Sequence, residues 1–378
     1  MQRKKIILVF YSLISLVIIS CTSKKDEETF SPTGSASDRE ALLVHVADDI
    51  IIPSYAKFNV KLDALVSKSQ AFTDAPAQLT LDELRSAWRE AYIEWQKVEL
   101  FDVGPANTYT LRFYINTYPT SVSKINDNIA SGTADMHEAF SYDAQGFPAF
   151  DFMINSGATD QDILNRYTIA TDATKRINYL KLLTSEMNTK CDQVYNAWTS
   201  GYRNDFVSKT GTDASSSLAL LVNGYTLNYE RYIRSGKIGI PAGALVSYNP
   251  SLQTIEALYK QDLSLTLAKT AQQASFDFFN GKSVLTGIEG ASFKTYLLAI
   301  GATDSQTGTA LATVLGNQFQ IVNDKLDALG PILYDDITDQ PQQIKEAYDA
   351  LQKAVRLIKV DMSSSMSITI SYVDNDGD

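Results

Sequence analysis

A stretch of sequence at residues 80–105, TLDELRSAWREAYIEWQKVELFDVGP, decides the fold. Thr80 and Glu83 have the spacing of a capping box, which marks the start of a helix. Apolar residues then recur every three or four positions, on one face of that helix: Leu84, Trp88, Ala91, Trp95 and Val98. Gly104-Pro105 ends the pattern. The segment is therefore predicted to be a helix whose aromatic stripe faces other helices.

The same periodicity extends over most of the chain. Ser37 and Glu40 form another capping box, ahead of a helix that Pro53 is expected to kink. Further helical patterns span residues 175–204, 214–235, 252–279, 290–300, 306–329 and 341–360. Heptad-like spacing in long segments favours helices packed at shallow angles in bundles. The chain is predicted to be all-α.

Two packed helical-bundle domains are expected. The run from Gly236 to Gly243 is rich in glycine and breaks the helical pattern, so it is interpreted as a linker. The N-terminal bundle is predicted at residues 38–235, and the C-terminal bundle with its tail at residues 244–378. Near the end, apolar residues alternate with small polar ones, as in a short strand or extended segment: Met366, Ile368, Ile370 and Tyr372.

The N-terminus has the features of a bacterial lipoprotein. Arg3-Lys4-Lys5 precedes an apolar run from Ile6 to Ile19 that is short for a transmembrane helix, and Cys21 follows. We predict a signal peptide at residues 1–20, a lipid on Cys21 that binds the membrane, and a flexible tether at residues 21–37. The alternative is an uncleaved anchor with an ordinary cysteine.

Charge and cysteine content exclude some classes of function. The chain has 33 basic and 44 acidic residues, and loss of the signal peptide leaves 30 basic residues and a net charge of −14. Nucleic acid is therefore excluded as a partner, because phosphate binding needs a basic face. Once Cys21 carries lipid only Cys191 remains, so no disulfide can form within the mature chain. Cys191 lies on an apolar stripe and is predicted to be buried.

Several motifs occur in a fixed order along the chain: Trp88 and Trp95, Glu99 to Pro105, Tyr118-Pro119, Gly146 to Asp151, Ile238 to Pro241, and Asp374 to Asp378. Together they resemble the imelysin family, bacterial envelope proteins tied to iron uptake and once proposed to be metallopeptidases. The resemblance implies a protein of the cell envelope. The run Lys24-Lys25-Asp26-Glu27-Glu28 after the lipid site resembles the surface-export signals of Bacteroidetes lipoproteins, which favours an outer-membrane lipoprotein that faces either the periplasm or the cell surface. The family resemblance also implies iron- or haem-uptake proteins of the outer membrane as partners.

The sequence departs from the family pattern at the residues that carry its chemistry. Where the family has Gly-x-His-x-x-Glu, this chain has Gly146-Phe147-Pro148-Ala149-Phe150-Asp151, with Pro148 in place of the histidine and Asp151 in place of the glutamate. Tyr92 stands where the family often has arginine. These changes suggest a variant subgroup with Gly-Phe-Pro-x-x-Asp, and they weaken the case for a histidine-based metal site.

Three carboxylates are candidates for a remaining site. Pro148 fits the first turn of a helix, which places Asp151 near the end of that turn. Glu99 continues the stripe of Trp88 and Trp95, so it is expected to point inward, with Asp102 one turn away. Such an oxygen-rich set would suit iron, Ca²⁺ or Mg²⁺ better than zinc, with Asp151 and Glu99 as the metal ligands. The alternative is a structural network of hydrogen bonds that joins two helices.

Three functions remain open from the sequence. The first is a non-enzymatic envelope binding protein linked to iron or haem acquisition. The second is a hydrolase or peptidase that uses a carboxylate-bound metal, and the third is a surface interaction module whose site is vestigial. A zinc peptidase is disfavoured, since the chain has only two histidines, His45 and His137, and neither lies in the family motif.

Overall fold

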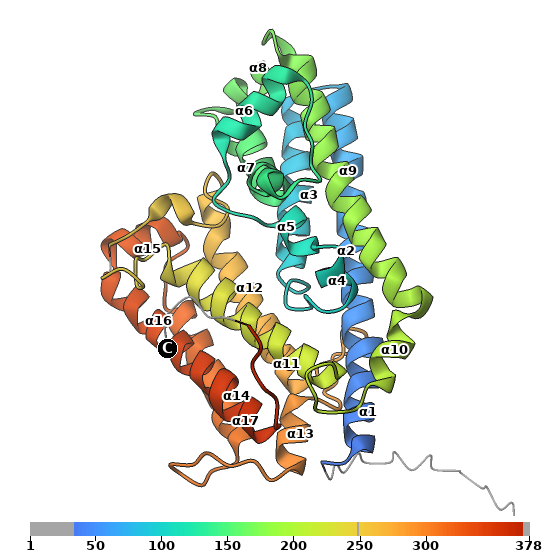
Figure 1. The fold of residues 1–378 in the computed structure, drawn as a ribbon. Coiled ribbons are helices and arrows are strands. Elements are labelled where there is room, and N and C mark those ends of the chain that lie inside the picture. Colours follow the sequence, from blue (N-terminus) through green and yellow to red (C-terminus); the bar gives the residue numbers. More distant parts are fainter. Residues whose placement is uncertain (1–33, 248, 373–378) are drawn as a thin grey trace, which may run out of the picture. The chain divides into compact units, whose positions relative to one another are not determined.

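One long helix packs along two others in the computed structural model, which describes residues 34–247 and 249–372 (Figure 1), and the central one of the three is α2. They are α2 (Ile52–Asp74), α3 (Gln78–Trp95) and α9 (Ala173–Ala197). α1 (Ala36–His45) and a π-helical turn, η1 (Val46–Ile51), lead into α2. The predicted helix with the aromatic stripe is thus confirmed as α3, and its stripe is buried, but the helix ends at Trp95 instead of reaching Gly104-Pro105, so Val98 and Glu99 lie in the turn that follows.

Shorter helices fill the rest of this half of the chain: α4 (Pro105–Thr108), α5 (Leu111–Ile115), α6 (Val122–Ser131), η2 (Ala139–Ala144), α7 (Gly146–Asn155), α8 (Asp160–Thr168), η3 (Trp198–Tyr202) and α10 (Arg203–Ser208). Several of them pack against α9, and α7 also packs against α3. The motif from Gly146 to Asp151 therefore lies at the start of α7, against the aromatic stripe.

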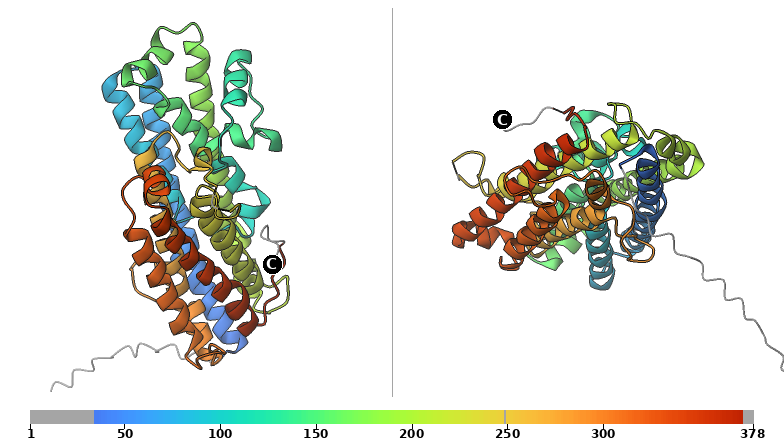
Figure 2. Two further views of the ribbon diagram at one scale, coloured as in Figure 1. Left: turned by 90° about the vertical axis from the view of Figure 1, so that its left-hand side faces the viewer. Right: turned by 90° about the horizontal axis from the view of Figure 1, so that it is seen from below.

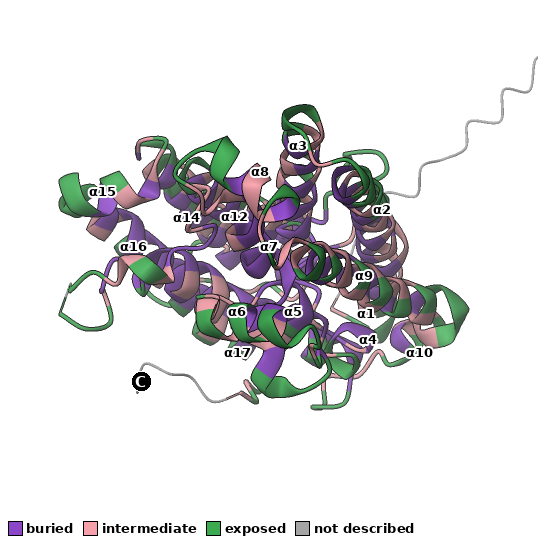
Figure 3. Ribbon diagram, turned by 90° about the horizontal axis from the view of Figure 1, so that it is seen from above, coloured by how far each residue is buried: buried purple, intermediate pink, exposed green. Residues whose placement is uncertain are grey.

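The second half of the chain is built from α11 (Ser217–Leu227), η4 (Asn228–Gly239), η5 (Leu252–Thr254), α12 (Gln261–Asn280), α13 (Phe293–Ala299), α14 (Leu311–Asp327), α15 (Leu333–Asp339), α16 (Pro341–Arg356), η6 (Leu357–Met362) and α17 (Ser363–Ser365). α14 packs on α12 and α16, and η4 packs on the same two helices (Figure 2). α12 also contacts α3, so the two halves share one hydrophobic core (Figure 3). The predicted division into two bundles remains a prediction.

The all-α prediction is confirmed. Helices make up 71% of the structure, and the described residues contain no strand. The predicted extended segment follows α17 and is held by Asn223 of α11. The Asn223 amide donates to the carbonyl of Thr369 at 3.0 Å, and its oxygen accepts the backbone N–H of Ser371 at 2.7 Å. The Asn223 side chain thus makes the two backbone hydrogen bonds that a neighbouring strand would otherwise make with this segment.

Both predicted capping boxes are shifted along the chain. The first is formed by Ser35 and Asp38, two residues before Ser37 and Glu40, so the ordered fold also starts before residue 38. The second helix begins at Gln78, where Thr80 accepts the N–H of Ala77 instead of starting the helix. Several Ser, Thr, Asp and Glu residues stand close together at both places, so spacing alone did not identify the cap.

The kink expected at Pro53 takes the form of the π-helical turn η1 just before it. Proline has no N–H to donate to the carbonyl four residues earlier, which is that of Asp49. That carbonyl instead accepts the N–H of Val284 at 2.8 Å. The helix defect therefore binds a loop of the second half of the chain.

Two other sequence predictions are corrected. Gly236 to Gly243 is not simply a linker, because η4 continues to Gly239 and buries Lys237. The helix predicted at residues 252–279 is interrupted before α12 begins at Gln261. In that interruption Ala257 has a left-handed backbone, with φ at 55°. The local apolar pattern cannot show either feature, because both depend on contacts with distant residues.

Some predictions lie outside the described residues. These are the signal peptide at residues 1–20, the lipid on Cys21, all of the tether except residues 34–37, and the acidic ending Asp374 to Asp378. Among the described residues, no helix is both long enough and apolar enough to cross a membrane.

Candidate functional site

The aromatic residues of α3 form a platform for the motif helix α7. The Trp88 indole donates to the carbonyl of Phe147 at 3.3 Å. The rings of Tyr92 and Phe147 are stacked, with centroids 4.5 Å apart and planes at 12°. Trp95 packs against Phe58 of α2. Trp88, Tyr92 and Trp95 thus position the motif and are not themselves exposed to a ligand.

Gly146 is required by the way α7 begins. Its φ is +71°, a left-handed conformation that disfavours a side chain. A Cβ atom at this position would lie 2.2 Å from the carbonyl oxygen of Ile115. The family glycine therefore has a steric explanation, which is the close approach of α7 to the end of α5.

Pro148 and Asp151, one helical turn apart, face a very small cavity. Tyr118, Pro119 and Tyr259 also line it, and its volume is about 10 Å³. A cavity of this size holds about one water molecule. Because Pro148 has no side-chain donor or acceptor, Asp151 is the one ionisable group that the motif presents there.

Asp151 is buried among neutral donors. Its Oδ2 accepts the backbone N–H of Tyr259 at 2.9 Å, and its Oδ1 accepts the side-chain amide of Asn155 at 2.9 Å. Burial raises the pKa of Asp151 to about 7, against the lowering effect of these hydrogen bonds and of Lys260. A carboxyl group with such a pKa gains or loses a proton near neutral pH.

Glu99 points inward, as predicted, but it meets two cations of the chain itself. Arg112 of α5 donates to Glu99 Oε2 at 3.3 Å and also to the backbone carbonyl of Glu99. Lys237 of η4 places its Nζ 3.3 Å from Glu99 Oε1, as an ion pair outside hydrogen-bonding geometry. All three side chains are buried. The inward-pointing acid is therefore neutralised by the protein.

A second buried acid, Glu256, extends this network. Its Oε2 accepts a hydrogen bond from Lys237 at 2.7 Å. Its Oε1 accepts from the amides of Gln96 at 3.1 Å and Asn116 at 2.8 Å. Tyr92 then donates to the Asn116 oxygen at 2.7 Å. The network reaches from α3 to the segment before α12, across the two halves of the chain.

The sequence analysis missed Arg112, Lys237 and Glu256. Each is a charged residue in a largely apolar stretch, which is a weak signal of burial with a partner. Two buried acids and two buried bases balance one another in this network. We refer to Glu99, Arg112, Lys237 and Glu256 below as the buried charge network.

The three predicted metal-site carboxylates are not brought together. Asp102 lies 3.7 Å from Arg112 Nε, at the edge of the buried charge network. Asp151 has other partners, while Glu99 binds two cations. No group of three or more His, Cys, Asp or Glu side chains in the described ranges is arranged to hold a metal ion. The donors around Asp151 and Glu99 fit the alternative of a structural network, and metal binding there remains a prediction.

Cys191 and the two histidines supply no chemistry to this region. Cys191 is buried, as predicted, and burial raises the pKa of its thiol. His45 is packed between Asp49, 3.1 Å away, and the carbonyl of Gly281, 2.8 Å away. His137 is exposed and lies before the η2 turn.

An open hollow of about 220 Å³ lies beside the buried charge network. Tyr118 and Pro119 line both this hollow and the small cavity of Asp151. Its other lining residues include Arg112, Phe113, Arg231, Tyr232 and Ile240. We call it the arginine hollow; it shares lining residues with the cavity of Asp151 and is large enough to admit a small ligand.

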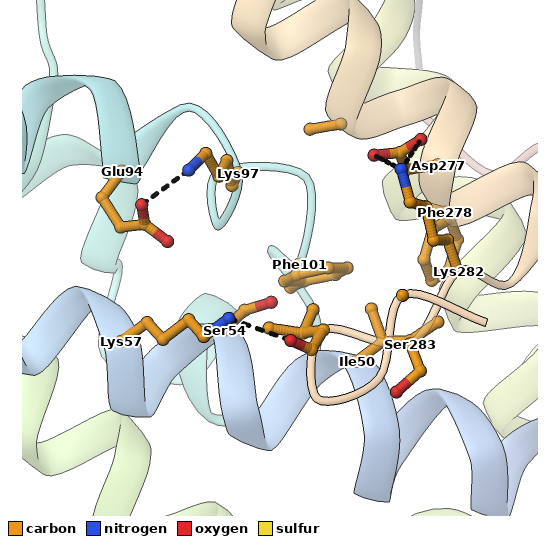
Figure 4. Close-up of a pocket in the computed structure, with 13 residues that line it drawn as sticks. Ile50, Ser54, Lys57, Glu94, Lys97, Phe101, Asp277, Phe278, Lys282 and Ser283 are labelled. Atoms are coloured by element: carbon orange, nitrogen blue, oxygen red, sulfur yellow. Dashed lines mark hydrogen bonds and ion pairs between the residues drawn. The ribbon is translucent and has the colours of Figure 1, made fainter.

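A larger hollow of about 380 Å³ lies elsewhere, between α2, the turn after α3, α12 and the loop at residues 282–287 (Figure 4). Three lysines line it: Lys57, Lys97 and Lys282. Lys97 pairs with Glu94 at 2.7 Å and Lys282 with Asp277 at 3.4 Å. None of the residues Gly146 to Asp151 line this hollow, which we call the lysine hollow. Its size does not make it the better candidate, since its acids already pair with its bases.

The chain was then compared with known proteins. The family model for imelysin, of the M75 peptidase group, matches residues 51–358. The chain is similar to Iron-regulated protein A of Synechococcus elongatus, with 26% identity over 132 residues, 34% of this chain and 36% of the relative. The matched part thus spans about a third of that curated relative's length.

Two solved structures share the fold. One is described as an iron-regulated protein A precursor from Parabacteroides distasonis, with a TM-score of 0.72, 19% identity, and coverage of 89% of this chain and 96% of that one. The other is an imelysin-like protein from Psychrobacter arcticum, with a TM-score of 0.69, 21% identity, and coverage of 91% of this chain and 100% of that one. At these identities the likeness concerns the fold alone.

Proposed function

This chain belongs to the imelysin family, and on that premise we propose that it is a lipid-anchored, non-enzymatic binding protein of the cell envelope that serves iron or haem acquisition. Its membrane attachment would be through lipid on Cys21. Its partners would be iron- or haem-uptake proteins of the outer membrane. The relative in Synechococcus elongatus is Iron-regulated protein A and the structure from Parabacteroides distasonis is described as an iron-regulated protein A precursor, which supports the link to iron.

The neutralised state of Glu99 is the observation that carries the non-enzymatic part of the proposal. A hydrolytic metal centre needs protein ligands and an open position for water. Here Glu99 is paired with Arg112 and Lys237, and Pro148 offers no ligand atom. Asp151 alone faces a cavity with room for about one water molecule. This arrangement favours binding over hydrolysis.

Metal content and peptide cleavage test the non-enzymatic part. The full chain and its Asp151→Ala variant would be incubated with iron, zinc or calcium, desalted, and analysed for bound metal and for cleavage of a peptide library. We expect no cleavage by either protein. Peptide cleavage by the wild type that depends on a metal and is lost in Asp151→Ala would establish the hydrolase instead.

Growth and fractionation test the envelope and iron parts. A strain that lacks the gene should grow more slowly than its parent when ferric iron or haem is the limiting iron source, and equally well when iron is plentiful. The wild-type gene should restore growth, and Cys21→Ala should move the protein out of the membrane fraction. Equal growth of both strains under iron limitation would contradict the link to iron.

A further inference from the structure

The lysine hollow is lined by one more base than acids. Its ionisable lining residues are three lysines and two carboxylates: Lys57, Lys97, Lys282, Glu94 and Asp277. Lys97 and Lys282 each pair with one of the acids, and among the described residues no acid pairs with Lys57. The lining therefore has a net charge of +1, in a protein whose formal net charge is −11. A positive hollow in an acidic protein favours an anionic ligand.

Two of the three N–H donors of Lys57 are not used by the protein. An ammonium group has three donors, and within the described chain one of them is accepted, by the carbonyl of Val284 at 2.9 Å. The Lys57 side chain is exposed, so a ligand can reach the other two. Lys57 can thus bind an anion and keep its contact with the loop at residues 282–287.

Ser54 places a second donor next to Lys57. The two residues lie three positions apart in α2, so their side chains are neighbours on one face of the helix. Ser54 is only 3% exposed, and its side chain lines the hollow beside Phe101 (Figure 4). Its hydroxyl has no hydrogen-bond partner among the residues that the structure describes, although buried polar groups normally have one. A carboxylate that accepts from both Ser54 and Lys57 would supply that partner.

One side of the hollow is apolar. The rings of Phe101 and Phe278 lie there with their centroids 5.6 Å apart, and Ile50 and Val284 also line it. An inorganic anion would leave this surface uncovered, whereas a ligand with an apolar body would remove it from water. The volume of about 380 Å³ is near the lower end of the range for small-molecule sites, roughly 300–1,000 Å³. It therefore suits one ring or a short chain.

We propose that the lysine hollow binds a small monocarboxylate with an apolar body, with the carboxylate on Lys57 and Ser54 and the body against Phe101 and Phe278. A single negative charge matches the net charge of the lining residues, so a monoanion is favoured over a dianion. The ligand would contact α2 and α12, which belong to different halves of the chain. The site is separate from the motif at Gly146 to Asp151 and does not depend on the proposed link to iron.

Calorimetry on the full chain at pH 7 tests the proposal with four probes. Hexanoate has the charge and an apolar body, hexanamide has the body without the charge, and acetate and inorganic phosphate have charge without an apolar body. We expect hexanoate to bind and hexanamide to bind at least about tenfold more weakly, because the charge contributes to the affinity. Acetate and phosphate should show no binding, because they cannot cover the apolar side. Hexanoate should also raise the unfolding temperature of the wild type.

Three variants locate the site. Ser54→Ala removes only a hydroxyl, and Lys57→Gln removes the charge but keeps an amide donor, so each should weaken hexanoate binding about tenfold. Ala274→Phe fills the hollow without changing its charge and should abolish binding. The matched control is Lys61→Gln, at another lysine of α2 that pairs with Glu90 and lies outside the hollow, and it should bind hexanoate as the wild type does. Thermal unfolding of each variant confirms that it is folded.

Some outcomes would overturn the proposal. They are equal affinity for hexanoate and hexanamide, binding of acetate or phosphate as tight as that of hexanoate, wild-type affinity in both Ser54→Ala and Lys57→Gln, or no binding of hexanoate by the folded wild type. Equal weakening by Lys61→Gln would also overturn it, because the effect would then come from the overall charge of the protein. None of these results bears on growth under iron limitation, so the two proposals fail separately.

Discussion

Glu99, in the turn after α3, and Asp151, in α7, are both buried carboxylates, yet the protein holds them in different ways. Glu99, 2% exposed, lies between Arg112 and Lys237. Asp151, 1% exposed, accepts hydrogen bonds from Tyr259 and Asn155, which carry no charge. One acid is compensated by buried charges in contact with it, and the other mainly by neutral hydrogen-bond donors.

The difference decides which acid can respond to its surroundings. When a buried acid is paired with a base, removal of the base leaves an uncompensated charge inside the protein, which is strongly destabilising. A buried acid with neutral donors gives up its charge when the pH falls, because desolvation favours its protonated form. Glu99 is therefore expected to serve stability, while Asp151 is expected to respond to pH.

Removal of Lys237 should have the largest effect. Lys237→Met leaves Glu99 and Glu256 buried with too little positive charge, which should lower the free energy of unfolding by about 3 to 5 kcal/mol. Urea unfolding at pH 7 measures it. Lys97→Met is the matched control, because Lys97 is 47% exposed in its pair with Glu94, and an exposed pair contributes about 0 to 1 kcal/mol. A similar small loss in both variants would show that the buried charge network is not needed.

Asp151 should make the stability of the protein depend on pH. Its pKa is about 7 in the folded state and 3.8 in the reference state, so the folded protein binds the proton more tightly. Its contribution to stability is complete below pH 4 and is lost as the pH rises to 7. Between pH 5 and pH 8 the wild type should lose about 3 kcal/mol relative to Asp151→Asn.

Urea unfolding across that pH range gives the measurement for Asp151. The control is Asp349→Asn, at an aspartate whose side chain is 54% exposed, and it should follow the wild-type curve. Parallel curves for the wild type and Asp151→Asn would mean that Asp151 is charged throughout the range.

The amide of Asn155 should account for a smaller part of the same behaviour. Asn155→Ala removes the donor to Asp151 Oδ1, so the charged form loses a hydrogen bond worth about 1 kcal/mol. The pKa of Asp151 should therefore move further above 7, and the pH at which stability stops falling should move up with it. An unchanged pH profile would show that Tyr259 alone holds the carboxylate.

Lys260 should have the smallest effect. Its charge lowers the pKa of Asp151, but its side chain is 41% exposed. Lys260→Gln should raise the pKa of Asp151 by only a few tenths of a unit, and the difference from wild type should disappear at about 1 M salt, where charges are screened within about 3 Å. The variant keeps the backbone hydrogen bond of Lys260 to Asp151, so a larger shift that persists in salt would mean that the Lys260 ammonium group itself pairs closely with Asp151.

The features that depend on the spacing of residues along one helix could be predicted from the sequence. The stripe of Trp88 and Trp95 and the burial of Cys191 are confirmed, because each follows from spacing along one helix. Glu99 also points inward as predicted, although α3 ends at Trp95 and Glu99 lies in the turn that follows. The place of Gly146 at the start of a helix also follows from the local sequence. These features need no knowledge of which helices become neighbours.

The sequence did not predict the partners. Glu99 meets Lys237, which is far along the chain in a run interpreted as a linker. Asp151 meets the backbone of Tyr259 in a segment interpreted as helix. Such contacts depend on how the two halves of the chain pack, and a single sequence carries no direct signal of that. The apolar spacing shows that these acids point inward. It does not show whether a metal ion or a lysine lies opposite them.

The π-helical turns have a consequence for the way relatives are aligned. Such a turn holds more residues than an α-helical turn, so everything after it is rotated by about 100° for each added residue. Lys237 lies near the end of the π-helical segment η4. In a relative that lacks the extra residue, an ungapped alignment would match Lys237 to a position on the outer face. Other family members can be searched for the cation opposite Glu99. At about 20% identity, the alignment should then allow a one-residue gap inside this helix.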